Sequence, residues 1–185
     1  FGTAPGASPR SSPPLDLSFD ARQDVLLPAV QRALLRKLRN RWFWGFLWRM
    51  PTRSWRRSAS TSRSFSNPWG DGEDPVAEDD NLLARFALRV MALGFDHGLL
   101  CSCAAAPNSR IWDLHQWDEW RSQGLGTTVH TGLLAIFSNS LHTTAGLRDL
   151  GPIFHASEHP FPLPPRALAS MQASLAAEWE RVRRW

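Results

Sequence analysis

Residues 25–50, VLLPAVQRALLRKLRNRWFWGFLWRM, contain the pattern on which the expected fold class depends. Apolar side chains recur there at four-residue spacing, at Leu26, Val30, Leu34 and Leu38. Because an α-helix turns once in about 3.6 residues, this spacing places the apolar side chains on one face. The stretch therefore predicts an amphipathic helix whose other side carries Arg32, Arg36 and Arg39.

The expected start of this helix is Asp20, whose carboxylate can accept hydrogen bonds from the first backbone N–H groups. Gln23 follows three residues later, as in a capping box. Pro28 is compatible with a helix only near its start. It must therefore lie within the first turns or make the helix begin later.

An aromatic run follows this helix, with the sequence WFWGFLW at residues 42–48. Even with its flanks it is far shorter than the roughly 20 residues that a membrane-spanning helix needs. Residues 51–69 are rich in Ser and Arg, and we expect them to be irregular. The run is therefore interpreted as a short aromatic plug at a membrane boundary or against a partner protein.

Helical signals recur in the rest of the chain. We expect a helix capped by Asp79 or Asp80, and further helices over residues 111–121, 127–141 and 165–185. The expected apolar face of the first of these consists of Leu83, Phe86, Ala87, Val90, Leu93 and Gly94. Gly146 is expected to end the helix that begins at Thr127. No segment shows sustained strand alternation. The sequence thus predicts a mainly α fold: four or so helices joined by Pro/Gly/Ser-rich loops, an extended N-terminal arm, and no parallel-sheet or barrel signal.

Composition shifts divide the chain into four parts. They are an extended arm at residues 1–19, an amphipathic helix plus aromatic segment at 20–50, an Arg/Ser-rich and then acidic linker at 51–78, and a helical region at 79–185.

The charge of the chain is unevenly distributed. Between Val25 and Gly70 there are ten positive charges and no negative one. The 14 residues between Gly70 and the next base, Arg85, hold six acids. Such blocks are typical of interaction segments or solvated tails. The chain also has 10 Trp, no Tyr, one Lys and 20 Arg. A biased coding sequence explains the missing Tyr and Lys, whereas Trp is typical of cores, interfaces and membrane boundaries.

Two features bear on the compartment. The chain begins at Phe1 rather than Met, so we expect it to be processed or truncated, and processing would have removed a targeting peptide. Cys101 and Cys103 are the only cysteines, and Cys-x-Cys is too tight for an ordinary disulfide. They are expected at a helix end, half-buried, in a reducing compartment.

Three motifs were weighed as chemical sites. Residues 155–159, HASEH, match the H-x-x-E-H order of inverted zinc peptidases, but surrounding prolines make a helix there improbable. His97, Cys101, Cys103 and His115 lack the Cys-x-x-Cys spacing of a structural zinc site. Residues 124–128 lack the Lys and spacing of a phosphate-binding loop. We therefore predict no catalytic residue, no metal and no cofactor.

The basic aromatic segment remains as the expected contact surface. Its predicted contacts with anionic lipid or RNA are Arg36, Arg39, Arg41, Arg49, Arg53, Arg56, Arg57 and Arg63. Its predicted membrane-interface or partner anchors are Trp42, Phe43, Trp44, Phe46, Trp48 and Trp55. Guanidinium groups on lipid phosphates with aromatic rings at headgroup level are typical of an interfacial anchor. Arginines on phosphates with rings stacked on bases are typical of RNA binding. A third reading has the Trp residues packed in the core or on a protein partner, with the arginines solvated.

These observations predict a non-catalytic accessory (structural) subunit of a large organellar membrane complex. We expect it to be peripheral to the mitochondrial inner membrane, with a plastid membrane as a second possibility, and to contact anionic lipid or partner subunits but no small-molecule substrate. The alternative is a mitochondrial ribosomal protein that binds rRNA through residues 32–63. A small zinc hydrolase is a distant third.

Overall fold

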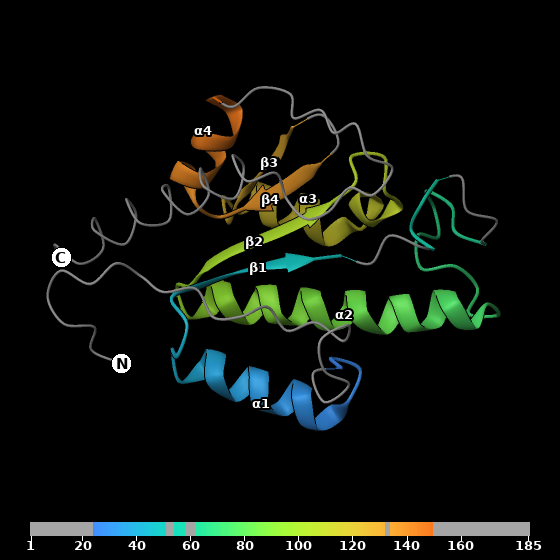
Figure 1. Ribbon diagram of the computed structural model, residues 1–185. Helices are drawn as coiled ribbons and strands as arrows, with labels where there is room; N and C mark the ends of the chain where they lie inside the picture. The colour runs from blue at the N-terminus through green and yellow to red at the C-terminus, as the bar shows by residue number, and fades with distance from the viewer. Residues whose placement is uncertain (1–23, 51–53, 58–61, 132–133, 150–185) are drawn as a thin grey trace, which may run out of the picture.

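One four-stranded mixed sheet forms the centre of the molecule (Figure 1). The computed structural model describes residues 24–50, 54–57, 62–131 and 134–149. Its strands are β1 (Gly45–Arg49), β2 (Leu100–Ala105), β3 (Thr127–His130) and β4 (Ala135–Ser138). Their order is β1-β2-β4-β3, with β1 parallel to β2 and the other two pairings antiparallel.

Four α-helices surround this sheet in the described part of the chain: α1 (Pro28–Arg39), α2 (Pro75–Asp96), α3 (His115–Ser122) and α4 (Leu141–Asp149). A short 3-10 helix, η2 (Arg110–Asp113), precedes α3. The long helix α2 packs on β2, α1 packs on the opposite side of α2, and α4 packs on β3 and β4 (Figure 1).

The predicted mainly α fold without a parallel sheet is therefore wrong. The central strands β2 and β4 were missed because they are buried on both faces. All four residues of β4 are buried, as are five of the six residues of β2. A strand buried on both faces shows a continuous apolar run instead of alternation, and periodicity cannot distinguish such a run from a buried helix.

The helix expected over residues 127–141 shows this ambiguity most clearly. Its first half is β3, its second half is β4, and α4 begins only at Leu141. Gly146, expected to end a helix, lies inside α4. The segment folds as an antiparallel pair because Val129 is opposite Ile136, and both side chains are buried.

The aromatic run at residues 42–48 contributes the edge strand β1. Trp and Phe favour extended backbone, since their rings pack well on a half-buried pleated surface. Gly45 permits the close pairing with β2: a Cβ at this position would lie 2.7 Å from the carbonyl oxygen of Leu100. Among the described strands, β1 pairs with β2 alone, so its other edge faces away from the sheet.

Helix α2 is the element to which the other layers attach. It begins at Pro75, because the Asp74 carboxylate accepts a hydrogen bond from the backbone N–H of Val76 and Pro fits the first helical turn. The predicted cap at Asp79 or Asp80 is thus wrong by about one turn. Four residues of the predicted apolar face, Phe86, Ala87, Val90 and Gly94, are buried, whereas Leu83 and Leu93 are half-buried.

Much of the unusual Trp content is core. Trp117 is fully buried, and its ring lies 5.2 Å from the centroids of both Trp120 and Phe137. Phe95 of α2 meets Trp120 edge to face at 5.0 Å. These rings join α2, α3 and β4 into one apolar cluster.

Candidate anion-binding site

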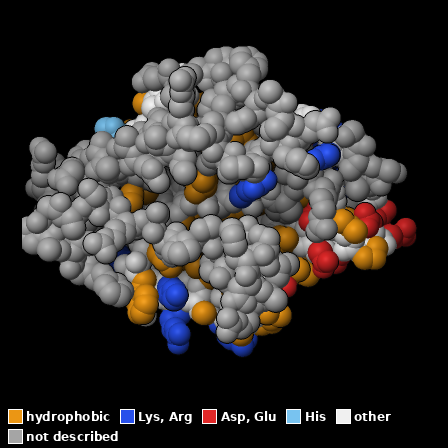
Figure 2. Space-filling view, viewed as in Figure 1, with side chains coloured by type: hydrophobic (Ala, Val, Ile, Leu, Met, Phe, Trp, Pro, Cys, Tyr) orange, Lys and Arg blue, Asp and Glu red, His pale blue; other side chains and the backbone are white. Residues whose placement is uncertain are grey.

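Helix α1 presents a basic face on the outside of the molecule. Leu35 and Leu38 are buried against the rest of the fold, and the exposed residues of the helix include Arg32, Arg36, Lys37 and Arg39. The helix contains no acidic residue. Basic side chains in the last turn interact favourably with the helix dipole, which accounts for part of this composition. Figure 2 shows Lys and Arg side chains at the bottom of the molecule, where α1 lies, with others higher in the view, and Asp and Glu gathered at the right, where α2 begins.

The end of α1 extends this basic face. The backbone N–H of Trp42 donates to the carbonyl oxygen of Lys37 at 3.0 Å, and that of Arg41 donates to Leu38 at 2.9 Å. These two bonds form a Schellman C-cap. Arg41 has φ 53°, a left-handed conformation that is usually reserved for Gly. The cap places Arg41 and Trp42 in solvent beyond the helix, with the Lys37 ammonium 5.8 Å from the centroid of the Trp42 ring.

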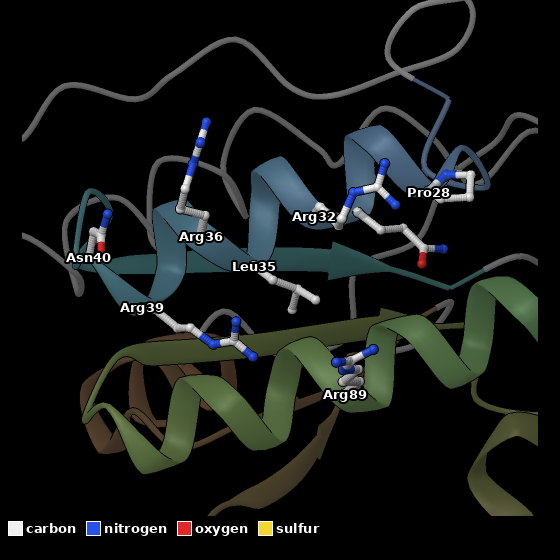
Figure 3. A pocket seen from close by; sticks show the side chains of 8 residues that line it. Pro28, Arg32, Leu35, Arg36, Arg39, Asn40 and Arg89 are labelled. Atoms are coloured by element: carbon white, nitrogen blue, oxygen red, sulfur yellow. The ribbon is translucent and has the colours of Figure 1, made fainter.

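A groove of about 480 Å³ lies between α1 and α2. Four of its lining residues are arginines, three from α1 (Arg32, Arg36, Arg39) and one from α2 (Arg89). No acidic residue of the described chain lines it. Figure 3 shows Arg39 and Arg89 reaching from the two helices toward the space beside Leu35, whereas Arg36 extends away. The groove is therefore open, arginine-lined and floored by an apolar side chain.

The predicted aromatic anchors divide into exposed and packed residues. Trp42 is 55% exposed. Phe43, Trp44, Phe46 and Trp48 are half-buried, and all but Trp44 pack against the main apolar cluster. Trp48 meets Phe86 of α2 edge to face at 5.7 Å. Most of these rings thus fix β1 to α2.

Trp55, the remaining predicted anchor, lies in the core and is 0% exposed. Its ring is covered by Trp69 on one side, with centroids 5.5 Å apart, and by the guanidinium of Arg63 on the other, 3.8 Å from the ring centroid. This placement leaves no Trp55 surface for a membrane or an RNA base.

The predicted basic contacts after α1 do not form one surface. Arg49 and Arg56 are exposed, and Arg53 lies outside the described residues. The Arg57 guanidinium donates to the Asp113 carboxylate at 2.8 Å. Arg63 is only 4% exposed. The structure therefore concentrates free basic surface on α1 rather than on residues 49–63.

Arg63 is held inside the chain by a complete set of hydrogen bonds. Its three nitrogens donate to the carbonyl oxygens of Ser54, Pro68 and Ala77, to the Asn81 side chain and to the Ser54 hydroxyl. These are five bonds, and a guanidinium has five N–H donors. Burial lowers the pKa of Arg63, and the nearby Asp80 carboxylate opposes that shift. The residue acts as an internal clamp.

In the described residues no group of three potential metal ligands comes together. Cys101 and Cys103 lie on β2 rather than at a helix end, and both are buried. Residues 155–159 fall outside the described chain. The turn at Gly124 has φ 71° and leads into β3.

Burial should make both thiols inert in the folded protein. It raises the pKa of Cys101 to about 12 and raises that of Cys103 as well. At pH 8, iodoacetamide should leave the native chain unmodified while it labels the urea-unfolded chain, because the thiolate is the nucleophile. Mass spectrometry of timed samples measures this. Native labelling at the unfolded rate would contradict the buried placement.

The same shifts give a sign for pH dependence. Free thiols ionise near pH 8.5, whereas these two stay protonated in the fold. At a pH between the free-thiol pKa and the raised pKa of these thiols, the folded state binds more protons than the unfolded state. The free energy of unfolding should therefore fall as pH rises above about 8.5. Replacing Cys103 by Ala should reduce that slope.

Comparison with family models, with curated proteins and with solved structures finds no match to this chain. None of the helices in the described part combines the length and apolar character required to cross a bilayer. The site is therefore argued from its own residues. The predicted contacts Arg36 and Arg39 line the groove, whereas Arg32 and Arg89 were not among the predicted contacts. Only the packing of α1 on α2 brings the Arg89 side chain to the groove.

Proposed function

We propose that the chain is a non-catalytic accessory subunit that docks on an anionic surface through α1. The observation that supports this most is the exposed basic face of α1, extended by Arg41 and Trp42 and without an acidic residue in the helix. The expected setting is a large organellar membrane complex, peripheral to the mitochondrial inner membrane or a plastid membrane. Its contacts there would be anionic lipid or partner subunits.

The side chains favour a lipid headgroup surface over RNA. Binding of single-stranded RNA uses aromatic faces on which bases can stack. Most aromatic rings of residues 42–48 are instead half-buried, and Trp42 is the exposed aromatic residue among them. One Trp beside several bases suits a peripheral contact in which the ring sits at headgroup level and the cations face phosphates. Leu47, 39% exposed on β1, is a second apolar residue on the surface.

Co-sedimentation with vesicles tests this proposal. The full chain should bind vesicles containing phosphatidylserine and not vesicles of phosphatidylcholine alone. Each basic residue near an anionic surface contributes about 1 kcal/mol, so Arg36→Gln with Lys37→Gln should weaken binding about 30-fold. The matched control is Arg121→Gln with Arg148→Gln, which removes the same charge from α3 and α4.

The outcomes separate the candidate functions. Equal weakening by both double variants would show that net charge, not the α1 face, drives binding. Binding to neither vesicle would overturn the lipid proposal. Association with ribosomal subunits that ribonuclease abolishes would favour the alternative, rRNA binding through residues 32–63.

A further inference from the structure

We propose that the groove between α1 and α2 is a specific site for a phosphate ester, clamped by Arg39 and Arg89. This deepens the proposed function, on which it rests, by assigning the ligand chemistry to one place on the basic face. The two arginines come from different helices and converge beside Leu35 (Figure 3).

The convergence of these side chains is unusual because like charges repel. Arg39 and Arg89 are exposed, and neither has an ion pair or side-chain hydrogen bond within the described residues. The three α1 arginines recur at spacings of four and three residues, which brings them to one side of the helix. A doubly charged anion between Arg39 and Arg89 would replace their repulsion by attraction. The helix dipole does not account for Arg89, which lies in the middle of α2.

Guanidinium groups suit phosphate in particular. Their planar N–H pairs match two phosphate oxygens, and such charge-assisted bonds are stronger than neutral ones. Arg32, on the same groove, provides a third cation.

The size and floor of the groove indicate an ester rather than a free ion. At about 480 Å³ it falls within the usual range of about 300–1,000 Å³ for small-ligand sites. Leu35 forms an apolar floor, and Pro28 also lines the groove, so carbon groups attached to the phosphate would have surface to contact. The ligand class is therefore a phosphate ester, either a lipid headgroup or a soluble metabolite.

Two titrations of the full chain test the site and its source. One uses glycerol 3-phosphate followed by calorimetry, and the other uses phosphatidylcholine vesicles with and without phosphatidic acid. Arg89→Gln and Arg39→Gln should each weaken binding about tenfold or more, because each removes a charge-assisted contact. The control Lys37→Gln removes the same charge from α1 outside the groove. It should weaken vesicle binding by about fivefold, the contribution of one surface charge, and binding of glycerol 3-phosphate by less.

Each outcome has a defined meaning. Arg89-dependent binding of the soluble ester supports a metabolite site, and Arg89-dependent binding of phosphatidic acid vesicles alone supports a lipid headgroup site. Equal effects of Arg89→Gln and Lys37→Gln would overturn the clamp while leaving the proposed docking face intact. If the chain binds phosphatidylserine vesicles but neither of the two phosphate monoesters, glycerol 3-phosphate and phosphatidic acid, the clamp also fails. If it binds no vesicle yet binds glycerol 3-phosphate through Arg89, docking fails and the site stands.

Discussion

Replacing Arg63 by Met is expected to lower the free energy of unfolding by about 3–5 kcal/mol, the usual cost of removing one partner from a buried charged network. The guanidinium makes five hydrogen bonds and stacks on Trp55 at 3.8 Å. Its loss removes the Arg63 donors from the carbonyl oxygens of Ser54, Pro68 and Ala77, two of which are in buried hydrogen bonds. It also removes the positive charge with which the buried Asp80 carboxylate interacts.

Ser54 connects these two charges. Its hydroxyl accepts from Arg63 at 2.8 Å and donates to Asp80 at 2.7 Å, and its backbone N–H donates to the same carboxylate at 2.9 Å. The network therefore attaches residues 54–57 and 62–70 to the first turns of α2. We expect the whole attachment to fail when the guanidinium is removed.

Urea denaturation followed by circular dichroism measures the loss. Arg63→Lys should lower the free energy of unfolding less than Arg63→Met, because Lys keeps the positive charge. It should still be destabilising, since Lys has only three donors and no planar group to stack on Trp55. The matched control is Arg56→Met, an exposed arginine nearby, which should change stability by no more than about 0.5 kcal/mol. A loss below about 1 kcal/mol for Arg63→Met would mean that the clamp does not form.

Gly94→Ala is expected to destabilise the fold by about 1–2 kcal/mol even though it places a better helix former inside α2. The change of Gly to Ala favours a helix by about 1 kcal/mol. At this position, however, the new methyl group would collide with the sulfur of Cys101 on β2, and it would lie 3.0 Å from the Phe46 ring on β1. Overpacking of this kind costs about 1–3 kcal/mol, occasionally more.

A double-mutant cycle isolates the collision. Cys101→Ala removes the sulfur and by itself leaves a small cavity. On that background Gly94→Ala should cost about 1 kcal/mol less than in the parent chain, or even stabilise it, because the methyl group gains the space. Additive losses in the two single variants and the double variant would contradict the close packing of α2 on the sheet. Thermal denaturation of the four proteins provides the comparison.

The helices were predictable because their signals are local. The face of α2 is marked by Phe86, Val90 and Gly94 at helical spacing, and these residues are buried as expected. For α1 the existence of the helix is confirmed, but its start moves to Pro28, and the buried residue Leu35 was not part of the predicted stripe. Burial of Leu35 depends on how α1 packs on α2, and local periodicity carries no information about that packing.

The sheet could not be recovered in this way. Pairing of β1 with β2 joins Phe46 to Cys101 across more than fifty residues of chain. Nothing local marks that parallel contact, and the buried strands show no alternation. The aromatic run was interpreted as a plug because its burial against Phe86 and the core is a tertiary property.

The candidate site was partly predictable, because charge along the sequence is a local signal but the packing of charged side chains is not. The positive block includes the arginines of α1, which are exposed. Charge counting treated the block as one surface, yet Arg63 folds inward against Asn81, which directly follows the acidic block. Arg89 lines the groove from α2, outside the positive block. Long-range packing decides which charges are internal and which are free.

The most direct test of the docking face is hydrogen–deuterium exchange of the full chain with and without phosphatidylserine vesicles. We predict slower exchange in peptides covering residues 28–42 when anionic vesicles are present, no change with neutral vesicles, and unchanged exchange over residues 127–149. Loss of the effect in the Arg36→Gln, Lys37→Gln variant would confirm that the basic face makes the contact. Bound chain with unchanged exchange at residues 28–42, or protection centred on another described element, would contradict it.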